Sequence, residues 1–227
     1  MIFAPYGTEA LELPADLVDR PGWAEWSAGH DVRLWHHATD APEPFAIFSR
    51  QDEGSFGFHF GTHAAACGRH AIMFRMGDPD LRASEGSMLS VLVRYRNALR
   101  LPDKYCWDLD QVTGDLVELG LLDPDREQAI LDACDTQPVF AAIEAAGYDA
   151  VLYPNETEGR DDDNRDSLMV WRASQIRSVH AAAFIEGCPR LCPTLTPTDV
   201  EDAWWRHNEQ GIDEWLPTLS LPLRSAA

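Results

Sequence analysis

The sequence has few cysteines, few basic residues and no long hydrophobic run, and each scarcity excludes a class of protein. No apolar stretch approaches the roughly 18 residues that a membrane-spanning helix needs. Residues 1–10 lack the basic start and apolar core of a secretory signal. The five cysteines are odd in number and form no Cys-x-x-Cys pair, so reduced thiols are expected. We therefore expect a cytoplasmic protein with no membrane partner.

Positive charge is the scarcest property of the chain. Its 227 residues include 18 Lys and Arg against 38 Asp and Glu, which gives a net charge of −20. Such a surface repels phosphate backbones, so non-specific nucleic-acid binding is not expected. Solubility is the ordinary reason for acidity, but the charge also leaves one alternative open. The chain could be a non-enzymatic acidic interaction protein that mimics nucleic acid or blocks a basic partner.

Several catalytic motifs are also missing. The sequence has no Gly-x-Ser-x-Gly elbow, Walker loop or Gly-x-Gly-x-x-Gly fingerprint, which argues against serine hydrolases, P-loop enzymes and Rossmann domains. His59 and His63 are four residues apart and His70 follows, but Gly61 and Thr62 interrupt a helix between the first two. No metal site is predicted, and a metal-dependent hydrolase stays a third possibility.

Hydrophobic residues make up 45% of the chain, enough for a folded core. Strand and helix patterns alternate without a regular βαβ rhythm, which favours an α+β fold over a doubly wound parallel sheet. Strands are expected over 31–37, 54–62, 148–153, 167–171 and 175–180, and around Val91 and Val93. Helices are expected over 125–134 and 138–146, the second ending at Gly147, with shorter helical stretches within 11–26 and 63–76.

Two groups of residues could hold a ligand. The strand over 31–37 ends in His36 and His37, followed by Thr39, and these side chains can donate hydrogen bonds to ribose or phosphate. The segment 57–62 reads Gly-Phe-His-Phe-Gly-Thr, with glycines for close backbone approach and aromatic faces for a flat ring. Each group also fits ordinary core packing.

An acidic tripeptide, Glu156-Thr-Glu158, follows the strand expected over 148–153. In an extended segment, residues two apart point to the same side, so both carboxylates could face one cleft. Glycosyl transfer through an oxocarbenium-like state needs such a negative charge beside the departing sugar carbon. Three aspartates over 161–163 continue the acidity, so a solvated acidic loop is the alternative interpretation.

Taken in order, these motifs resemble those of the ADP-ribosyltransferase family. His37-Ala-Thr39 resembles the family's His-Gly-Thr, with Ala38 in place of glycine. The segment 57–62 resembles its aromatic turn, with His59 at the usual tyrosine position. The stretch 147–159, followed by 166–171 and 174–178, is similar to the last third of bacterial and phage members. The resemblance covers about 32–179.

The resemblance implies two small, mostly antiparallel sheets packed around an NAD cleft, with helices at the flanks. It implies that the chain cleaves nicotinamide from NAD and transfers ADP-ribose to a macromolecular acceptor, with a protein expected, as a toxin or effector would. The implied catalytic residues are Glu156, Glu158 and His37. The implied NAD-binding residues are His36, Thr39, Gly57, Phe58, His59, Phe60 and Thr62.

A toxin-type alignment would instead place the catalytic acid at Asp166, which ranks third behind the two glutamates. The resemblance also divides the chain into an N-terminal extension (1–30), a catalytic domain (31–187) and a C-terminal appendage (188–227).

Overall fold

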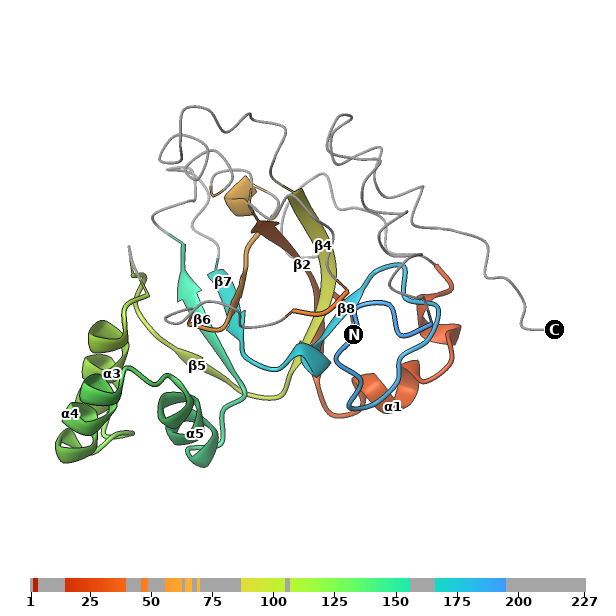
Figure 1. Ribbon diagram of the computed structural model, residues 1–227. Coiled ribbons are helices and arrows are strands. Elements are labelled where there is room, and N and C mark those ends of the chain that lie inside the picture. The colour runs from red at the N-terminus through yellow and green to blue at the C-terminus, as the bar shows by residue number, and fades with distance from the viewer. Residues whose placement is uncertain are drawn as a thin grey trace.

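The computed structural model describes residues 2–3, 15–39, 46–48, 56–62, 64–66, 69, 87–104, 107–155 and 166–194. Within these ranges the chain forms two four-stranded sheets with helices on either side (Figure 1). Most neighbouring strands run antiparallel. The expected α+β class, with two mostly antiparallel sheets and flanking helices, is confirmed at this level.

The first sheet has the strand order β1-β2-β4-β8. Its centre is the antiparallel pair of β2 (Asp31–Thr39) and β4 (Ser87–Tyr95), which stay in register from Asp31 opposite Tyr95 to Thr39 opposite Ser87. The strand β1 (Ile2–Phe3) runs parallel to β2, and β8 (Ile176–Ser178) runs antiparallel to β4.

The second sheet has the order β3-β7-β6-β5. The strands β3 (Phe58–Phe60), β7 (Asp166–Val170) and β6 (Ala150–Pro154) are antiparallel neighbours, and β5 (Ala98–Arg100) pairs in parallel with β6. The central strand β7 is late in the sequence and lies between β3 and β6. The sheet therefore combines segments separated by more than 100 residues.

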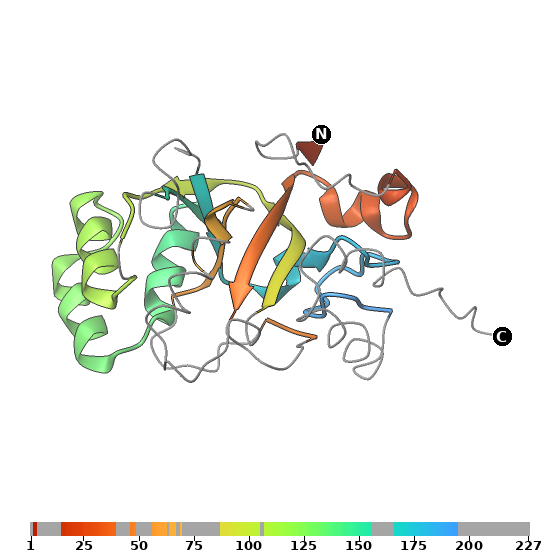
Figure 2. The same ribbon diagram turned by 90° about the horizontal axis from the view of Figure 1, so that it is seen from above.

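A backbone bridge joins the two sheets. The amide of His36 in β2 donates to the carbonyl of Gly61 at 3.0 Å, and the amide of Gly61 donates back at 2.9 Å. The edge of the second sheet is thus hydrogen-bonded to a central strand of the first. Seen from above, the sheets extend to opposite sides of this junction (Figure 2).

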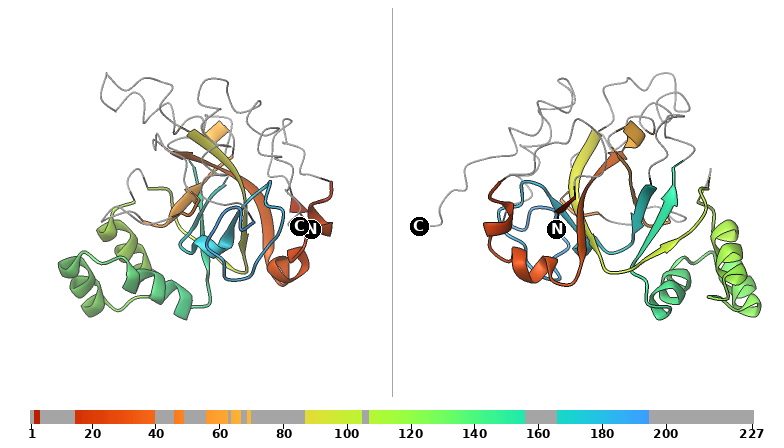
Figure 3. Two further views of the ribbon diagram at one scale, coloured as in Figure 1. Left: turned by 45° about the vertical axis from the view of Figure 1, so that its right-hand side comes forward. Right: turned by 180° about the vertical axis from the view of Figure 1, so that it is seen from behind.

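Three hydrophobic clusters follow from strand alternation, since successive side chains point to opposite faces. The inner cluster fills the space between the sheets and includes Trp35, Phe60, Val91 and Leu168. The second covers the outer face of the second sheet with α3 (Leu109–Glu118), α4 (Pro124–Ala133) and α5 (Gln137–Ala145). The third packs η1 (Leu17–Asp19) and α1 (Trp23–Ser27) on the outer face of the first sheet. The helices accordingly lie at opposite ends of the molecule (Figure 3).

Most expected elements occur where the sequence patterns indicate them. The helix predicted over 138–146 is α5, and Gly147 beyond its end has φ +92°, a conformation that favours glycine. Among the described elements, β1, β5, α3 and the short 3-10 helix over Ala173–Gln175 were not expected. In the range 63–76, residues 64–66 and 69 are helical and the others lie outside the described residues.

Candidate functional site

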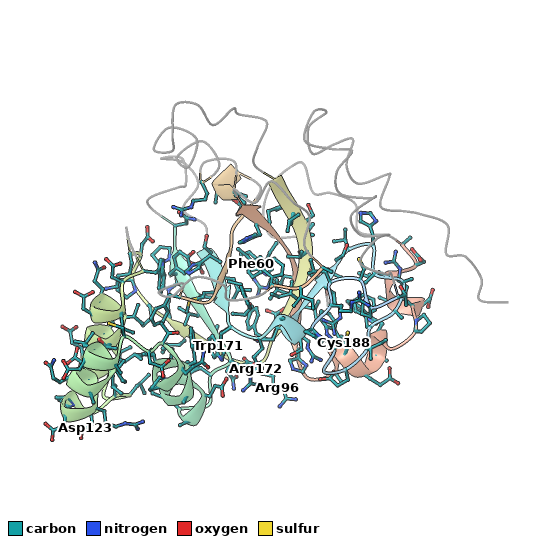
Figure 4. The ribbon with its side chains drawn as sticks, viewed as in Figure 1. Phe60, Arg96, Asp123, Trp171, Arg172 and Cys188 are labelled. Atoms are coloured by element: carbon teal, nitrogen blue, oxygen red, sulfur yellow. The ribbon has the colours of Figure 1, made fainter. Side chains whose placement is uncertain are left out.

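On the inner faces of the two sheets, side chains become more exposed toward one end of β2 and one end of β7. On β2, Trp35 is fully buried, whereas His37, two residues further along the same face, is half-buried. On β7, Leu168 is fully buried, whereas the side chain of Asp166 keeps 32% of its exposure. Figure 4 shows Phe60 between the sheets below this end. The inner core is therefore less enclosed at His37 on β2 and at Asp166 on β7, and we call this side its open edge.

His37 points into the inner side of this edge. Its Nδ1 lies 2.7 Å from the carbonyl oxygen of His59, which only a donor can approach, so Nδ1 carries the proton. Its ring meets Phe48 edge-on at 5.0 Å and Phe60 at 5.5 Å between centroids. The imidazole is thus held by a backbone acceptor and two aromatic rings.

His36 lies on the opposite face of β2. Its side chain is buried, and its Nδ1 is 3.1 Å from the Ser90 hydroxyl on β4. Thr39 is the last residue of β2, opposite Ser87. Strand alternation therefore separates the two neighbouring histidines, and His37 is the one that faces the inner side.

Alternation also divides the aromatic segment 58–60. Phe58 and Phe60 belong to the inner cluster, whereas His59 faces the outer side, where its ring contacts Trp107 and Tyr153 at 5.1 and 5.8 Å. The structure brings Phe60 together with His37, and it turns the imidazole of His59 away from both.

Two hydrogen bonds define the protonation of His59. Its Nε2 is 2.5 Å from the carbonyl of Phe56 and must donate, so Nδ1 accepts from the Tyr153 hydroxyl at 3.0 Å. Burial lowers the pKa of His59 to about 4, so the ring is neutral at pH 7. The neutral imidazole, which makes two hydrogen bonds, therefore fixes β3 against the end of β6.

The glycine and threonine of the segment 57–62 shape the backbone on either side of β3. Gly57 has φ +67°, and a Cβ there would come within 2.7 Å of Met169 Cγ and 3.0 Å of the Val170 carbonyl. Thr62 is buried, and its hydroxyl accepts from the amide of Ala65 at 3.1 Å, which caps the helical turn that follows. Both residues therefore have local structural roles.

A buried polar pair closes the base of the acidic segment. Asn155 directly follows β6, and its Nδ2 donates to the Ser167 hydroxyl on β7 at 2.7 Å. Both side chains are at most 5% exposed. Gly61 leaves room for this pair, since a Cβ there would lie 3.2 Å from the Ser167 oxygen. Glu156 and Glu158 lie outside the described residues, but Glu156 is covalently bonded to Asn155, so their Cα atoms are about 3.8 Å apart.

Asp166 has a cationic partner. Its two oxygens accept from Nη2 and Nη1 of Arg100 at 2.7 and 2.8 Å. This bidentate ion pair crosses over β6 from β5 to β7. Asp166 was predicted from the sequence as a candidate site residue, whereas Arg100, Asn155 and Ser167 were not. A polar residue within the apolar run of β7 was the available signal for Ser167, and no local pattern identified the other two.

The described residues include no group of three or more His, Cys, Asp or Glu side chains placed to hold a metal ion. None of the described helices has the length and apolarity required to cross a membrane. No protein-family model, curated protein or solved structure matches the chain. The site must therefore be interpreted from its own geometry.

Proposed function

We propose that the chain is an NAD-dependent ADP-ribosyltransferase that works at the open edge between its two sheets. The proposal rests on one observation: His37 at the end of β2 is hydrogen-bonded to β3, β3 pairs with β7, and the acidic segment joins the end of β6 to the start of β7. The sequence between those two ends, 156–165, carries Glu156 and Glu158. A hydrogen-bonding histidine, an aromatic floor and two carboxylates would thereby serve one cleft.

The chain is held firmly at Asn155, directly before Glu156, which supports Glu156 as the catalytic acid. Leu152 packs with the inner cluster, whereas Tyr153 packs with the outer one. Asn155 bonds to Ser167, and Ser167 lies between inner Leu168 and inner-facing Asp166 along β7, so the pair belongs to the outer side. Asn155, the last described residue before Glu156, is thereby anchored to the central strand of the second sheet.

The proposed reaction breaks the bond between C1′ of the nicotinamide ribose and the pyridinium nitrogen. The electron pair leaves with neutral nicotinamide, and the sugar carbon becomes positively charged. Glu156 stabilises this charge, because a carboxylate aimed at a developing cation acts mainly on the transition state. The acceptor's lone pair then forms the new bond to C1′, and its proton passes to Glu158 or to water.

The other residues take supporting roles in this proposal. His37 and Thr39 hold a ribose or the nicotinamide amide, and Phe60 forms the floor under the bound ring. His59 acts through Tyr153 and the Phe56 carbonyl, as a residue that positions β3. Gly57 and Phe58 maintain the turn and the core below the site.

Radiolabelled NAD tests the proposal directly. The protein is incubated with NAD labelled in the adenylate phosphate, together with a host lysate, and free nicotinamide is measured in parallel. We expect nicotinamide release and transfer of label, with a protein as the principal acceptor. The absence of nicotinamide release, together with no binding heat at millimolar NAD, would overturn the proposal.

One observation favours a second candidate function, an acidic protein that binds a basic partner. The residues from Trp107 to Tyr148, which contain α3, α4 and α5, include ten acidic side chains and a single basic one, Arg126. Such a surface would attract a cationic protein. If NAD is neither bound nor cleaved while the protein forms a salt-sensitive complex with a basic partner, this function replaces the first.

A further inference from the structure

A dinucleotide substrate creates an electrostatic problem for this chain. The two phosphates of NAD are anionic, and the protein carries a net charge of −20. A local cation must therefore offset the repulsion where the pyrophosphate lies. We expect this cation on the inner face of one of the two sheets, because the proposed cleft opens between them.

Arg100 lies on such a face. Its strand neighbour Leu99 belongs to the outer cluster, whereas Ala98 packs against the inner one, so alternation places Arg100 on the inner side. Across β6, its partner Asp166 follows the same rule, since Leu168 and Val170 belong to the inner cluster. The ion pair thus lies on the inner face of the second sheet, toward its open edge.

Alternation also assigns Arg33, on β2, to the inner face of its sheet. It lies near the opposite end of that strand, where it pairs with Asp31 at 2.7 Å. Of these two arginines, Arg100 is the one beside the acidic segment, because its partner Asp166 directly follows residues 156–165.

The Arg100 side chain is accessible to a ligand. It keeps 63% of its exposure although both of its Nη atoms bond to Asp166. A guanidinium has five N–H donors in one plane, and the pair occupies two of its nitrogens through one donor each. The remaining donors, and the positive charge, are available to phosphate oxygens. Exposed ion pairs of this kind are weak, so exchange of one anionic partner for another costs little.

We propose that Arg100 is the pyrophosphate-binding residue of the cleft and that Asp166 competes with the dinucleotide for it. This inference rests on the proposed function and adds a specificity-determining residue to it. In the ligand-free protein Asp166 neutralises Arg100, and the bound pyrophosphate takes over some or all of those hydrogen bonds. Asp166 is then a regulator of affinity and is not the catalytic acid.

The two partners have opposite effects on affinity in this scheme. Arg100→Gln removes the cation, so the Kd for a pyrophosphate-containing ligand should rise about tenfold, the usual effect of losing a charge-assisted hydrogen bond. Asp166→Asn removes the competing charge and leaves Arg100 in place, so the Kd should fall about threefold. A residue pair that only stabilises the fold would not give effects of opposite sign.

The chain offers a matched control pair. Arg172 and Glu144 form an ion pair at 2.6 Å with exposures of 56% and 32%, close to the 63% and 32% of Arg100 and Asp166. They lie at the other end of the second sheet, where Trp171 and Arg172 are seen below Phe60 (Figure 4). Arg172→Gln changes the net charge equally and should leave the Kd unchanged.

The test is calorimetric titration with ADP-ribose, which contains the pyrophosphate but cannot be cleaved to nicotinamide. Nicotinamide riboside, which lacks phosphate, is the second ligand, and its Kd should respond to neither variant. Thermal unfolding of each variant checks that the fold is retained.

Equal ADP-ribose affinity in the wild type, Arg100→Gln and Asp166→Asn would overturn the inference while leaving the proposed function intact. Weaker binding in Arg100→Gln and Arg172→Gln alike would also overturn it, because the effect would then be one of net charge. No binding of ADP-ribose or NAD to the wild type would overturn both proposals.

Discussion

His37 and His59 lie on neighbouring strands, and burial gives them different chemistry. His37 is half-buried at the open edge, whereas His59 is enclosed by Trp107, Tyr153 and the Phe56 carbonyl. Enclosure disfavours the charged imidazolium, so the pKa of His59 is lowered to about 4, with smaller effects from His37 and Arg69. A group with a depressed pKa binds a proton in the unfolded chain before it does so in the folded one.

This difference predicts a loss of stability in mild acid. Since the unfolded chain takes up the proton near pH 6.5 and the folded one only near pH 4, stability falls as the pH drops through that window. Between pH 7 and pH 5 we expect His59 to contribute a loss of about 2 kcal/mol. Urea unfolding at both pH values checks this, with His59→Gln as the comparison. The difference between the two pH values should shrink by about that amount in the variant, and an unchanged difference would show that His59 is not the cause.

The second prediction for a single residue concerns the catalytic acid. Glu156→Gln should lower the turnover of ADP-ribose transfer by about 100-fold or more while NAD affinity changes little, since the lost charge acts on the transition state. Glu158→Gln should be milder. Asp166→Asn should keep measurable transfer, because its carboxylate is engaged with Arg100. Steady-state kinetics of the three variants measure this.

The opposite ranking would settle the alternative alignment. If Asp166→Asn is inactive and Glu156→Gln is active, the toxin-type alignment is correct. If all three variants transfer at the wild-type rate, the acidic segment is a solvated loop with no catalytic part.

At the scale of elements, the prediction from sequence succeeded for segments with a clear local pattern. The strands β2, β6 and β7 and the helices α4 and α5 all occur where apolar periodicity and turn residues indicated them. The strand β5 was not predicted, because the contact that positions it involves a residue far away in the sequence. The chain turns after β4 where the Asp149 carboxylate accepts the backbone amides of Arg96 and Asn97. A contact across more than 50 residues leaves no mark on the local pattern.

The sequence also could not show which side of its sheet each site residue faces. Alternation shows that His36 and His37 point to opposite sides, but it does not show which side is the inner one. Both faces of the second sheet are covered, one by the first sheet and the other by α3 and α5, so both carry apolar residues. The types of residue at the candidate site were therefore predictable, whereas the partners of His59, Asp166 and Asn155 were not.

The turn into β3 gives a prediction at the same scale. Gly57→Ala should destabilise the protein by about 3 kcal/mol, because φ is +67° and the new Cβ would meet Met169 and the Val170 carbonyl. Gly29 is a matched control with φ +69° and nothing within 4 Å, so Gly29→Ala should cost only about 1 kcal/mol. Urea midpoints measure both, and equal losses would show that strain at φ alone determines the effect.

At the scale of the whole molecule, charge determines which partners approach. The chain carries 38 acidic and 18 basic residues, and several of its arginines are already paired internally. Arg94 binds Glu186 through two hydrogen bonds, and Arg177 is fully buried against backbone carbonyls. Among the described residues, these two arginines therefore contribute little to the attraction of a distant phosphate backbone.

We therefore expect no measurable binding to random duplex DNA at physiological salt. Fluorescence anisotropy with a labelled duplex of about 20 base pairs measures this, and NAD is not needed. A micromolar complex whose affinity falls steeply with added salt would show that the basic residues form a patch.

The order in which the strands combine has a consequence for synthesis. The second sheet cannot close until β7 enters between β3 and β6, and the first lacks its edge until β8 follows. On the ribosome, a nascent chain that ends before Asp166 would expose β3 without its neighbour and leave β6 paired on one side only. In the proposed enzyme, the edge that would take up NAD cannot assemble before β7 has emerged, although most of the chain is outside the ribosome by then. A growing polypeptide would therefore stay inactive until β7 and β8 in its final third are available.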